Sequence, residues 1–157
     1  MSATTLGGLF FQQFWEKKAF ELGGSDYAAP AQRAQDFVQG RNSQTLPDAL
    51  FMGRLKSADL HEALPAFVTR SLANAIRHHA NKAMPGLLEP DTLLVGVETR
   101  TSAPLRVCRN SNTLESLNVR GLFPLGEGAG YAGGIMTSAV DGVRAAEALL
   151  QRTEVLV

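Results

Sequence analysis

Five glycines within nine residues constrain the fold of this 157-residue chain more than any other feature. They lie in GLFPLGEGAGYAGG, residues 121–134, between a strand-like segment and a helix-like pattern. Each glycine in ordered backbone costs roughly 0.5–1 kcal/mol relative to alanine. A tight turn that packs a helix closely on a sheet needs only one or two of them. We therefore favour a backbone that passes directly beneath a flat or anionic ligand, with N–H groups free to donate at a helix N-terminus.

Gly128, Gly130 and Gly133 also match the dinucleotide fingerprint G-x-G-x-x-G. That fingerprint requires a second parallel strand that ends in an acidic residue about 20 residues later. Glu147 and Glu154 do not follow a recognisable strand. The context therefore argues against a first nucleotide-binding unit at this position.

Composition favours an ordinary globular chain and excludes several partners. The sequence is 45% apolar, with 15 basic and 15 acidic side chains, so the net charge of zero provides no electrostatic footprint for nucleic acid or an anionic membrane. Cys108 is the single cysteine, which excludes an internal disulfide and suits a reducing, cytoplasmic compartment. We expect it to act as a small hydrophobic residue. The amino terminus lacks the pattern of a secretion signal, and no apolar run approaches about 18 residues, so we expect no transmembrane helix.

Apolar periodicity predicts three helices, over residues 5–22, 65–83 and 132–151. The buried stripe of the second is expected to include Phe67, Val68, Leu72, Ala75, Ile76, His79, Ala80 and Ala83. That of the third is expected to include Ile135, Ala139, Val143, Ala146 and Leu150.

Branched residues predict strands at 92–100, 105–109 and 121–125. The segment 25–60 carries prolines and glycines without a sustained period, so we expect mostly loop with short helical turns. The predicted fold is α/β or α+β, a small mixed sheet with about three helices. We expect a mostly helical region at 1–90 and a second region at 91–157.

The run from Gly96 to Leu149, with GVETRTSAP and GEGAGYAGGI, resembles the carboxy-terminal part of a bacterial family of FAD-dependent dehydrogenases. This family lies within the glutathione-reductase-like flavoprotein class. The segments APAQRAQDFVQGR and ADLHEALP are similar to its middle region. The resemblance implies a carboxy-terminal fragment of a two-domain FAD-binding fold, whose pyrophosphate loop would lie in a missing amino-terminal nucleotide-binding region. Residues 1–90 would then be substrate-domain-like, and residues 91–157 would form the carboxy-terminal portion of the FAD-binding domain.

By this resemblance, Glu127 occupies the acidic position near the ribityl or phosphate part of FAD, although a surface or capping carboxylate is the alternative. Amides near Gly133, Gly134 and Ile135 would face flavin N1 and O2, where negative charge collects on reduction. Tyr131 would cover the ring system or merely pack over the loop. The implied cofactor-binding set is Gly126, Glu127, Gly128, Ala129, Gly130, Tyr131, Gly133, Gly134 and Ile135.

The same resemblance places Arg100, Thr101 and Ser102 near the flavin or substrate cavity as anion or carbonyl binders. An ion pair between Glu98 and Arg100 is the structural alternative. Gln32 and Arg33 either line the substrate side or hold a loop in shape.

Other polar residues point to no further site. Arg106 and Arg109 would either contribute to the anion or carbonyl binding expected of Arg100 or, as we favour, be solvated at the surface. No metal site is expected from His61, His78 and His79, and His79 is expected in the core. The sequence does not reveal a catalytic triad.

The expected function is therefore a fragment of an FAD-dependent oxidoreductase that acts on a small-molecule substrate. Alone, the fragment is expected to bind FAD weakly or not at all and to lack turnover. An apolar face exposed by the missing region would favour a homodimer. The alternative is a stand-alone binding or interaction module, whose glycine loop holds a phosphate-bearing ligand or which pairs with a separate nucleotide-binding subunit.

Overall fold

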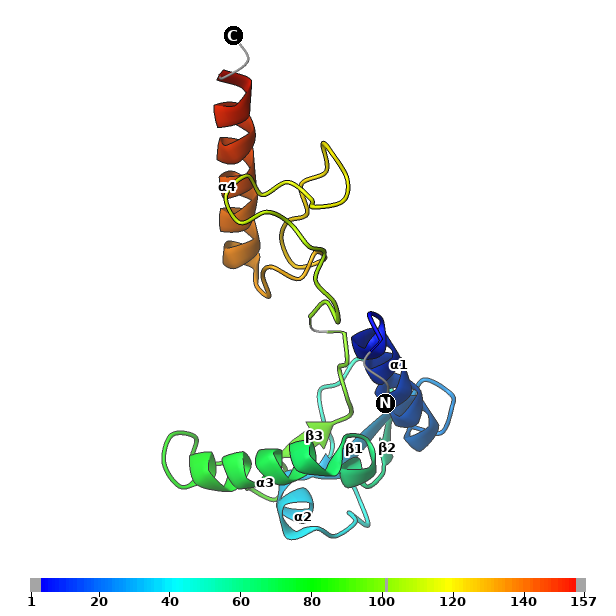
Figure 1. The fold of residues 1–157 in the computed structure, drawn as a ribbon. Helices are drawn as coiled ribbons and strands as arrows, with labels where there is room; N and C mark the ends of the chain where they lie inside the picture. The colour runs from blue at the N-terminus through cyan, green and yellow to red at the C-terminus, as the bar shows by residue number, and fades with distance from the viewer. Residues whose placement is uncertain (1–3, 101, 155–157) are drawn as a thin grey trace. The chain divides into compact units, whose positions relative to one another are not determined.

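The computed structural model describes residues 4–100 and 102–154, and within them the predicted mixed fold is confirmed. Four α-helices and a small three-stranded sheet are present in this part of the chain (Figure 1). The elements in order are α1 (Gly7–Leu22), β1 (Ala29–Arg33), α2 (Ala34–Gln39), β2 (Leu55–Ser57), the 3-10 helix η1 (Leu60–Glu62), α3 (Ala66–Ala80), β3 (Leu93–Val95) and α4 (Ile135–Glu154).

The chain forms two compact units. Residues 13–98 make the first, which contains the sheet and is called the sheet unit. Residues 1–12 and 99–157 make the second, which contains the glycine-rich segment and α4 and is called the glycine unit. The division falls within α1 and again just after β3.

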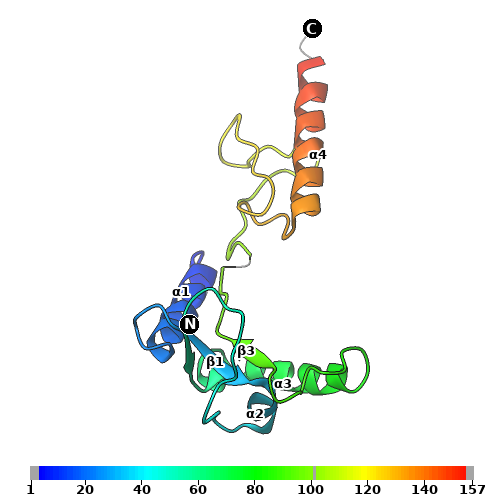
Figure 2. The same ribbon diagram turned by 180° about the vertical axis from the view of Figure 1, so that it is seen from behind.

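The sheet unit is organised around β1, which lies between the other two strands (Figure 1); Figure 2 shows β1 beside β3 from behind. It pairs parallel with β2 and antiparallel with β3, where Gln32 is opposite Leu94. A parallel pair needs a crossover connection, and the chain between β1 and β2 supplies it with α2 and a long loop.

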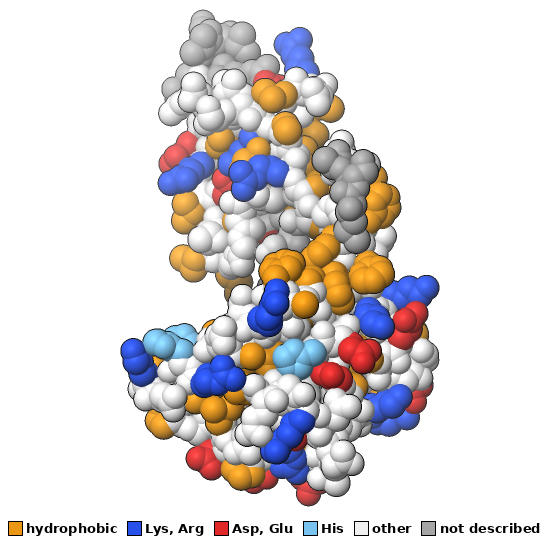
Figure 3. Space-filling view, turned by 60° about the horizontal axis from the view of Figure 1, so that its bottom comes forward, with side chains coloured by type: hydrophobic (Ala, Val, Ile, Leu, Met, Phe, Trp, Pro, Cys, Tyr) orange, Lys and Arg blue, Asp and Glu red, His pale blue; other side chains and the backbone are white. Residues whose placement is uncertain are grey.

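A small apolar core supports this sheet. A buried cluster consists of Phe37 of α2, Leu60 of η1, Ala63 after η1, and Ala73 of α3. Three helical elements therefore meet at one core. Partly buried side chains of Leu22, Val38, Ile76, Leu94 and Val97 pack against it. On the face of this unit seen in Figure 3, charges of both signs are interspersed and apolar side chains reach the surface between them.

Two strand predictions were wrong. Residues 105–109 form only a single bridge, between Arg109 and Ser116, and residues 121–125 form no strand. Pro124 has no N–H to donate to a ladder, and its carbonyl oxygen accepts a bond from the Arg109 side chain. The loop prediction for 25–60 was also wrong at β1 and β2, because APAQR lacks the branched residues on which strand recognition depends.

The predicted stripe of α3 needs correction. Thr69 and Ala73 are its buried residues, whereas Phe67 is 63% exposed and Leu72 is also exposed. His79 is exposed rather than in the core, and its ring contacts that of His78. The buried residues of α3 have small side chains, and this helix packs against α2.

The predicted stripe of α4 is wrong as well. Asp141 and Ala145 face inward, whereas all five residues of the expected stripe are exposed, with Ile135 at 90%. The apolar face of this helix is therefore uncovered by the described residues.

Candidate functional site

The glycine-rich segment forms a compact series of turns before α4. Gly126 and Gly130 adopt left-handed backbone angles, with φ of 69° and 81°. The Tyr131 N–H donates to the Gly126 carbonyl at 3.0 Å, and the Gly130 N–H donates to the Glu127 carbonyl at 2.9 Å. Positive φ strains any residue with a Cβ, so the turns themselves account for two of the five glycines.

Gly130 has a second requirement, because a Cβ there would lie 2.5 Å from the carbonyl oxygen of Leu105. Gly128 and Gly133 have no such requirement. A Cβ at either position would meet no heavy atom within 4 Å, and neither residue has a positive φ. At Gly134 the nearest atom, Thr137 Oγ1, is at an ordinary contact distance of 3.5 Å. Three of the five glycines therefore have no steric requirement within the described part of the chain.

An ion pair between Arg109 and Asp141 anchors these turns to α4. The guanidinium donates through Nη1 to Oδ2 at 2.9 Å and through Nη2 to Oδ1 at 2.7 Å, and both side chains are almost buried. Arg109 Nη1 also donates to the Pro124 carbonyl at 2.7 Å, and the Gly126 N–H donates to Asp141 Oδ2 at 2.9 Å. The pair thus joins three segments of the glycine unit.

The ion pair shifts both partners toward their charged forms. Hydrogen bonds from Arg109 lower the pKa of Asp141, against the opposing effect of burial, and the Gly126 N–H lowers it further. The bond to Asp141 raises the pKa of Arg109. The expected solvation of Arg109 was wrong. Asp141 was not identified from the sequence. The available signal was a lone acidic residue within the apolar stretch SAVDGV.

Tyr131 packs within the loop. The Arg109 guanidinium lies 3.6 Å from the centre of its ring, and that of Arg106 lies 5.0 Å away. The phenol hydroxyl donates to the Val107 carbonyl at 3.0 Å. Arg106 Nε donates to the Gly130 carbonyl at 2.9 Å. The nearby Cys108 is exposed.

The start of α4 is open. Thr137 Oγ1 accepts a bond from the Gly134 N–H at 3.2 Å, which is the side-chain cap of this end. Gly133, Ile135 and Met136 are exposed. A hollow of about 390 Å³ borders the first turns and is lined by Tyr131, Met136, Thr137, Val140, Asp141 and Arg144. The hydroxyl of Ser138 is buried without a hydrogen-bond partner among the described residues.

Glu127 and Ala129 differ in their surroundings. The Glu127 side chain is exposed, and within the described ranges no hydrogen bond or ion pair engages its carboxylate. Ala129 is buried, and its carbonyl oxygen accepts a bond from the Val107 N–H. Of the nine residues expected to bind the cofactor, the structure thus leaves Glu127, Gly128, Gly133, Gly134 and Ile135 accessible.

The three residues expected near the substrate are only partly described. Arg100 and Ser102 are exposed, and Thr101 lies outside the described residues. The Ser102 carbonyl oxygen accepts a bond from Gln12 Nε2 at 3.0 Å.

Gln32 and Arg33 both bind backbone of the sheet unit. Gln32 is 0% exposed; its Nε2 donates to the Arg41 carbonyl at 2.8 Å, and its Oε1 accepts from the Leu60 N–H at 2.9 Å. Arg33 Nε donates to the Thr45 carbonyl at 2.9 Å. These bonds give both side chains a loop-structuring role.

A second polar cluster holds the loop after α2. Ser43 donates to Asp36 at 2.7 Å, and Arg41 forms a 2.6 Å ion pair with the same carboxylate. The bond from Ser43 lowers the pKa of Asp36, with a further contribution from Arg41. The sequence pattern did not single out this cluster.

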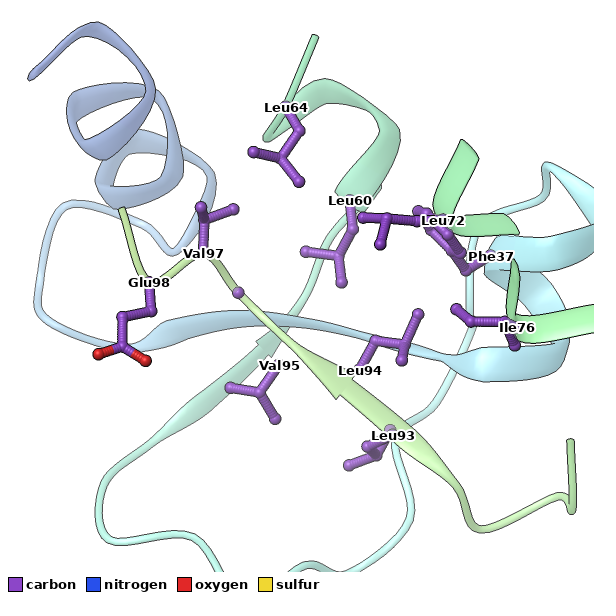
Figure 4. Close-up of a pocket in the computed structure, with 11 residues that line it drawn as sticks. Phe37, Leu60, Leu64, Leu72, Ile76, Leu93, Leu94, Val95, Val97 and Glu98 are labelled. Carbon is purple, nitrogen blue, oxygen red and sulfur yellow. The ribbon is translucent and has the colours of Figure 1, made fainter. Parts of the chain in front are cut away.

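The sheet unit also contains an apolar hollow of about 550 Å³ (Figure 4). It was not predicted from the sequence, because its residues come from four separate elements, from the link between η1 and α3, and from the segment after β3. They are Phe37, Leu60, Leu64, Leu72, Ile76, Leu93, Leu94, Val95, Gly96, Val97 and Glu98.

The described residues contain neither a metal-binding cluster nor a membrane-spanning helix. No group of three or more His, Cys, Asp or Glu side chains is placed to hold a metal ion within 4–100 and 102–154. No helix in the same ranges is long and apolar enough to cross a bilayer. His61 is occupied otherwise, since its ring stacks on Phe37 and its Nε2 lies 2.8 Å from the Phe37 carbonyl oxygen.

The mixed α/β fold and the open, glycine-rich helix start are compatible with a ligand-binding domain. Residues 1–101 match the family described as FAD-dependent protein, C-terminal domain-like, and the chain belongs to this family. An uncharacterized protein from Clostridium beijerinckii is 42% identical over 152 residues, which cover 96% of this chain and 28% of the relative. The chain thus spans less than a third of the length of the relative that it matches.

Proposed function

We propose that this chain is part of a bacterial FAD-dependent dehydrogenase of the glutathione-reductase-like class, and that residues 126–135 form the flavin-ring side of its FAD site. The observation that supports this proposal is the exposed segment before α4, where no atom of the described chain requires glycine at Gly128 or Gly133. The family match over residues 1–101 supports the FAD dependence of the parent protein; it does not include residues 126–135 and therefore does not bear on their role.

The residues of the junction fit such a cofactor. A flat ring can approach bare backbone closely, and no atom of the described residues lies within 4 Å of a Cβ added at Gly128 or Gly133. The Gly134 N–H already donates to Thr137 Oγ1, so the amides of Gly133 and Ile135 would face the ring edge. The exposed Glu127 carboxylate would accept a bond from a ribityl hydroxyl. When bound, FAD supplies the hydride or electron transfer that side chains cannot perform.

The chain's own contribution is then electrostatic. The N–H groups at the start of a helix carry partial positive charge, which stabilises a nearby anion by about 0.3–2 kcal/mol. The Arg109–Asp141 pair fixes the turn that leads to those N–H groups, because Asp141 accepts from the Gly126 N–H. These residues position the junction and are not expected to touch the substrate.

Other parts of the proposed enzyme lie outside this chain. Because the chain spans 28% of its relative, we assign the adenosine half of FAD to a nucleotide-binding region elsewhere in the polypeptide. Residues 1–90 would belong to the substrate domain and 91–157 to the FAD-binding domain. Arg100, Thr101 and Ser102 would bind an anionic or carbonyl group of a small-molecule substrate. We place the enzyme in the cytoplasm.

The exposed apolar face of α4 would be covered in the whole protein. Ile135, Met136, Val140 and Val143 are all exposed on this helix, and soluble proteins rarely leave large apolar patches uncovered. The rest of the polypeptide would cover them, and in its absence a second copy would do so.

A flavin titration tests the proposal. The Clostridium beijerinckii relative is expected to bind FAD, and alanine at the position aligned with Gly133 is expected to weaken binding about tenfold or more, or about 1.4 kcal/mol. The matched control is alanine at the position aligned with Gly142, a helical glycine of α4 whose added Cβ also meets nothing within 4 Å. Fluorescence quenching of FAD measures both. Equal affinities for all three proteins would overturn the assignment.

The isolated chain provides a second comparison. We expect it to bind FAD weakly or not at all, because the adenosine half has no site within it. Micromolar affinity for the 157-residue chain would contradict the proposed division of the FAD site.

A stand-alone module is the second candidate, and the self-contained core of the sheet unit favours it. Its glycine loop would hold a phosphate-bearing ligand, or the chain would pair with a separate nucleotide-binding subunit. Genomic sequence immediately upstream discriminates between the two. An in-frame glycine fingerprint supports the flavoenzyme, whereas a stop codon followed by an independent start supports the module.

A further inference from the structure

The outer edge of β3 has backbone groups that no strand of the described chain pairs. The Thr92 carbonyl accepts from the Ala34 N–H, and the Gly96 N–H donates to the Pro30 carbonyl. The backbone groups of Thr92 and Gly96 therefore point toward β1. Alternate residues of a strand direct their N–H and C=O groups to opposite sides. The backbone N–H and C=O groups of Leu94, which is opposite Gln32, therefore point toward β1. Those of Leu93 and Val95 point away from it. Since β3 is the last strand in the order β2-β1-β3, these groups form a free edge.

The two edges of this sheet differ in chemistry. β2 presents the sequence Leu-Lys-Ser, and its exposed Lys56 is a charge of the kind that protects edge strands from unwanted pairing. β3 presents Leu-Leu-Val without a charge, and Val95 is exposed. Only the β3 edge is therefore suited to receive another strand.

The apolar hollow lies beside the same strand. Leu93, Leu94 and Val95 all line it, and Leu94 points toward Leu72 and Ile76 of α3 (Figure 4). A strand that pairs with an edge directs every second side chain to the same face of the sheet. The hollow of about 550 Å³ would receive such side chains if they were apolar.

We propose that the outer edge of β3 is completed by an additional β-strand, which comes from polypeptide outside these 157 residues and places apolar side chains in the hollow. Backbone hydrogen bonds to an edge supply affinity in this mode of binding, and pockets for alternate side chains supply specificity. The relative has the necessary polypeptide, because this chain spans only 28% of it. This inference concerns the sheet unit; it rests on the proposal that the chain is part of a longer protein, and not on the flavin assignment.

Hydrogen exchange at single amides tests the proposal. In this chain, the Leu94 and Gly96 amides are expected to exchange slowly and those of Leu93 and Val95 quickly. In the Clostridium beijerinckii relative, the amides aligned with Leu93 and Val95 are expected to exchange about tenfold or more slowly than here. Exchange there as fast as in this chain would overturn the proposal. Protection of Val95 in this chain alone that rises with its concentration would also overturn it, because the partner would then be a second copy.

Two variants at one position separate the backbone from the side chain. Overlapping peptides that cover the rest of the relative are titrated against this chain, and one region is expected to bind and to protect the Leu93 and Val95 amides. Val95→Pro removes an outward N–H and is expected to abolish binding, whereas Val95→Ala keeps it and is expected to weaken binding only severalfold. Slow exchange at Leu94 and Gly96 verifies that both variants fold. If no peptide binds, or if both variants bind equally, the proposed strand is wrong.

Discussion

The sheet unit and the glycine unit are held together in different ways. Phe37 and Leu60 belong to a core that the sheet unit makes from its own side chains, and Gln32 is fully buried beside it. In the glycine unit, irregular turns are joined to one long helix through Arg109 and Asp141. The first arrangement spreads its stability over many contacts. The second concentrates it in one ion pair, so single substitutions should affect the two units very differently.

The largest effect is expected from Asp141→Ala. The substitution leaves the Arg109 guanidinium almost buried without its partner and leaves the Gly126 N–H unpaired. Removing one member of a buried pair costs about 3–5 kcal/mol. Urea-dependent amide exchange at Val107, which is bonded to the Ala129 carbonyl, measures the glycine unit.

Two controls accompany this variant. Glu147→Ala removes an exposed carboxylate from the same helix and should change stability by less than about 0.5 kcal/mol. Trp15 lies in the sheet unit. Its fluorescence should show that this unit unfolds at the same urea concentration in the Asp141 variant as in the unchanged chain. Equal stability of the two variants at Val107 would show that the ion pair does not hold this unit.

A smaller effect is expected from Gln32→Ala in the sheet unit. The Arg41 carbonyl and the Leu60 N–H each lose a partner. Leaving buried polar groups unsatisfied costs about 1–3 kcal/mol. Trp15 fluorescence during urea unfolding measures the loss. Gln39→Ala, at an exposed position of α2, is the matched control and should be nearly neutral. A fully stable Gln32 variant would mean that water replaces the amide without cost.

Acidification below pH 3.8 should have the smallest effect. Hydrogen bonds from Arg109 and from Ser43 lower the pKa values of Asp141 and Asp36 respectively. Each carboxylate therefore contributes its full stability above its ordinary pKa of 3.8. That stability is lost as pH falls below 3.8 through the lowered, folded-state value.

Thermal unfolding measured from neutral pH down through this window checks the prediction. Asp36→Asn should flatten the profile of the sheet unit and leave that of the glycine unit unchanged. An equal acid response in the variant and the unchanged chain would assign the effect to other carboxylates.

The long helices could be predicted because their apolar residues recur over several turns. α1, α3 and α4 begin within three residues of the expected starts at 5, 65 and 132. Their buried faces were harder to predict, since periodicity identifies an apolar face but not what covers it. On α4 the apolar face is exposed, and the helix packs inward through Asp141 and Ala145.

The missed features depend on contacts between distant residues. β1 is a central strand made of APAQR, whose position comes from its two neighbours rather than from its own β propensity. Arg109 and Asp141 are 32 residues apart, and neither has a motif that would link them. The glycine-rich junction was recognised before the structure because its composition alone is unusual, but its ligand remains a prediction.

The ion pair also has a practical consequence for labelling. The loop from Asn110 to Glu115 is closed at its base by the Asn110 N–H, which donates to the Glu115 carbonyl at 2.8 Å, and by the bridge from Arg109 to Ser116. Its tip at Asn112 is exposed. Because Asn112 also borders a hollow lined by Arg144, Glu147 and Gln151 of α4, a fluorophore attached there should report whether the Arg109–Asp141 pair still holds the helix against the turns.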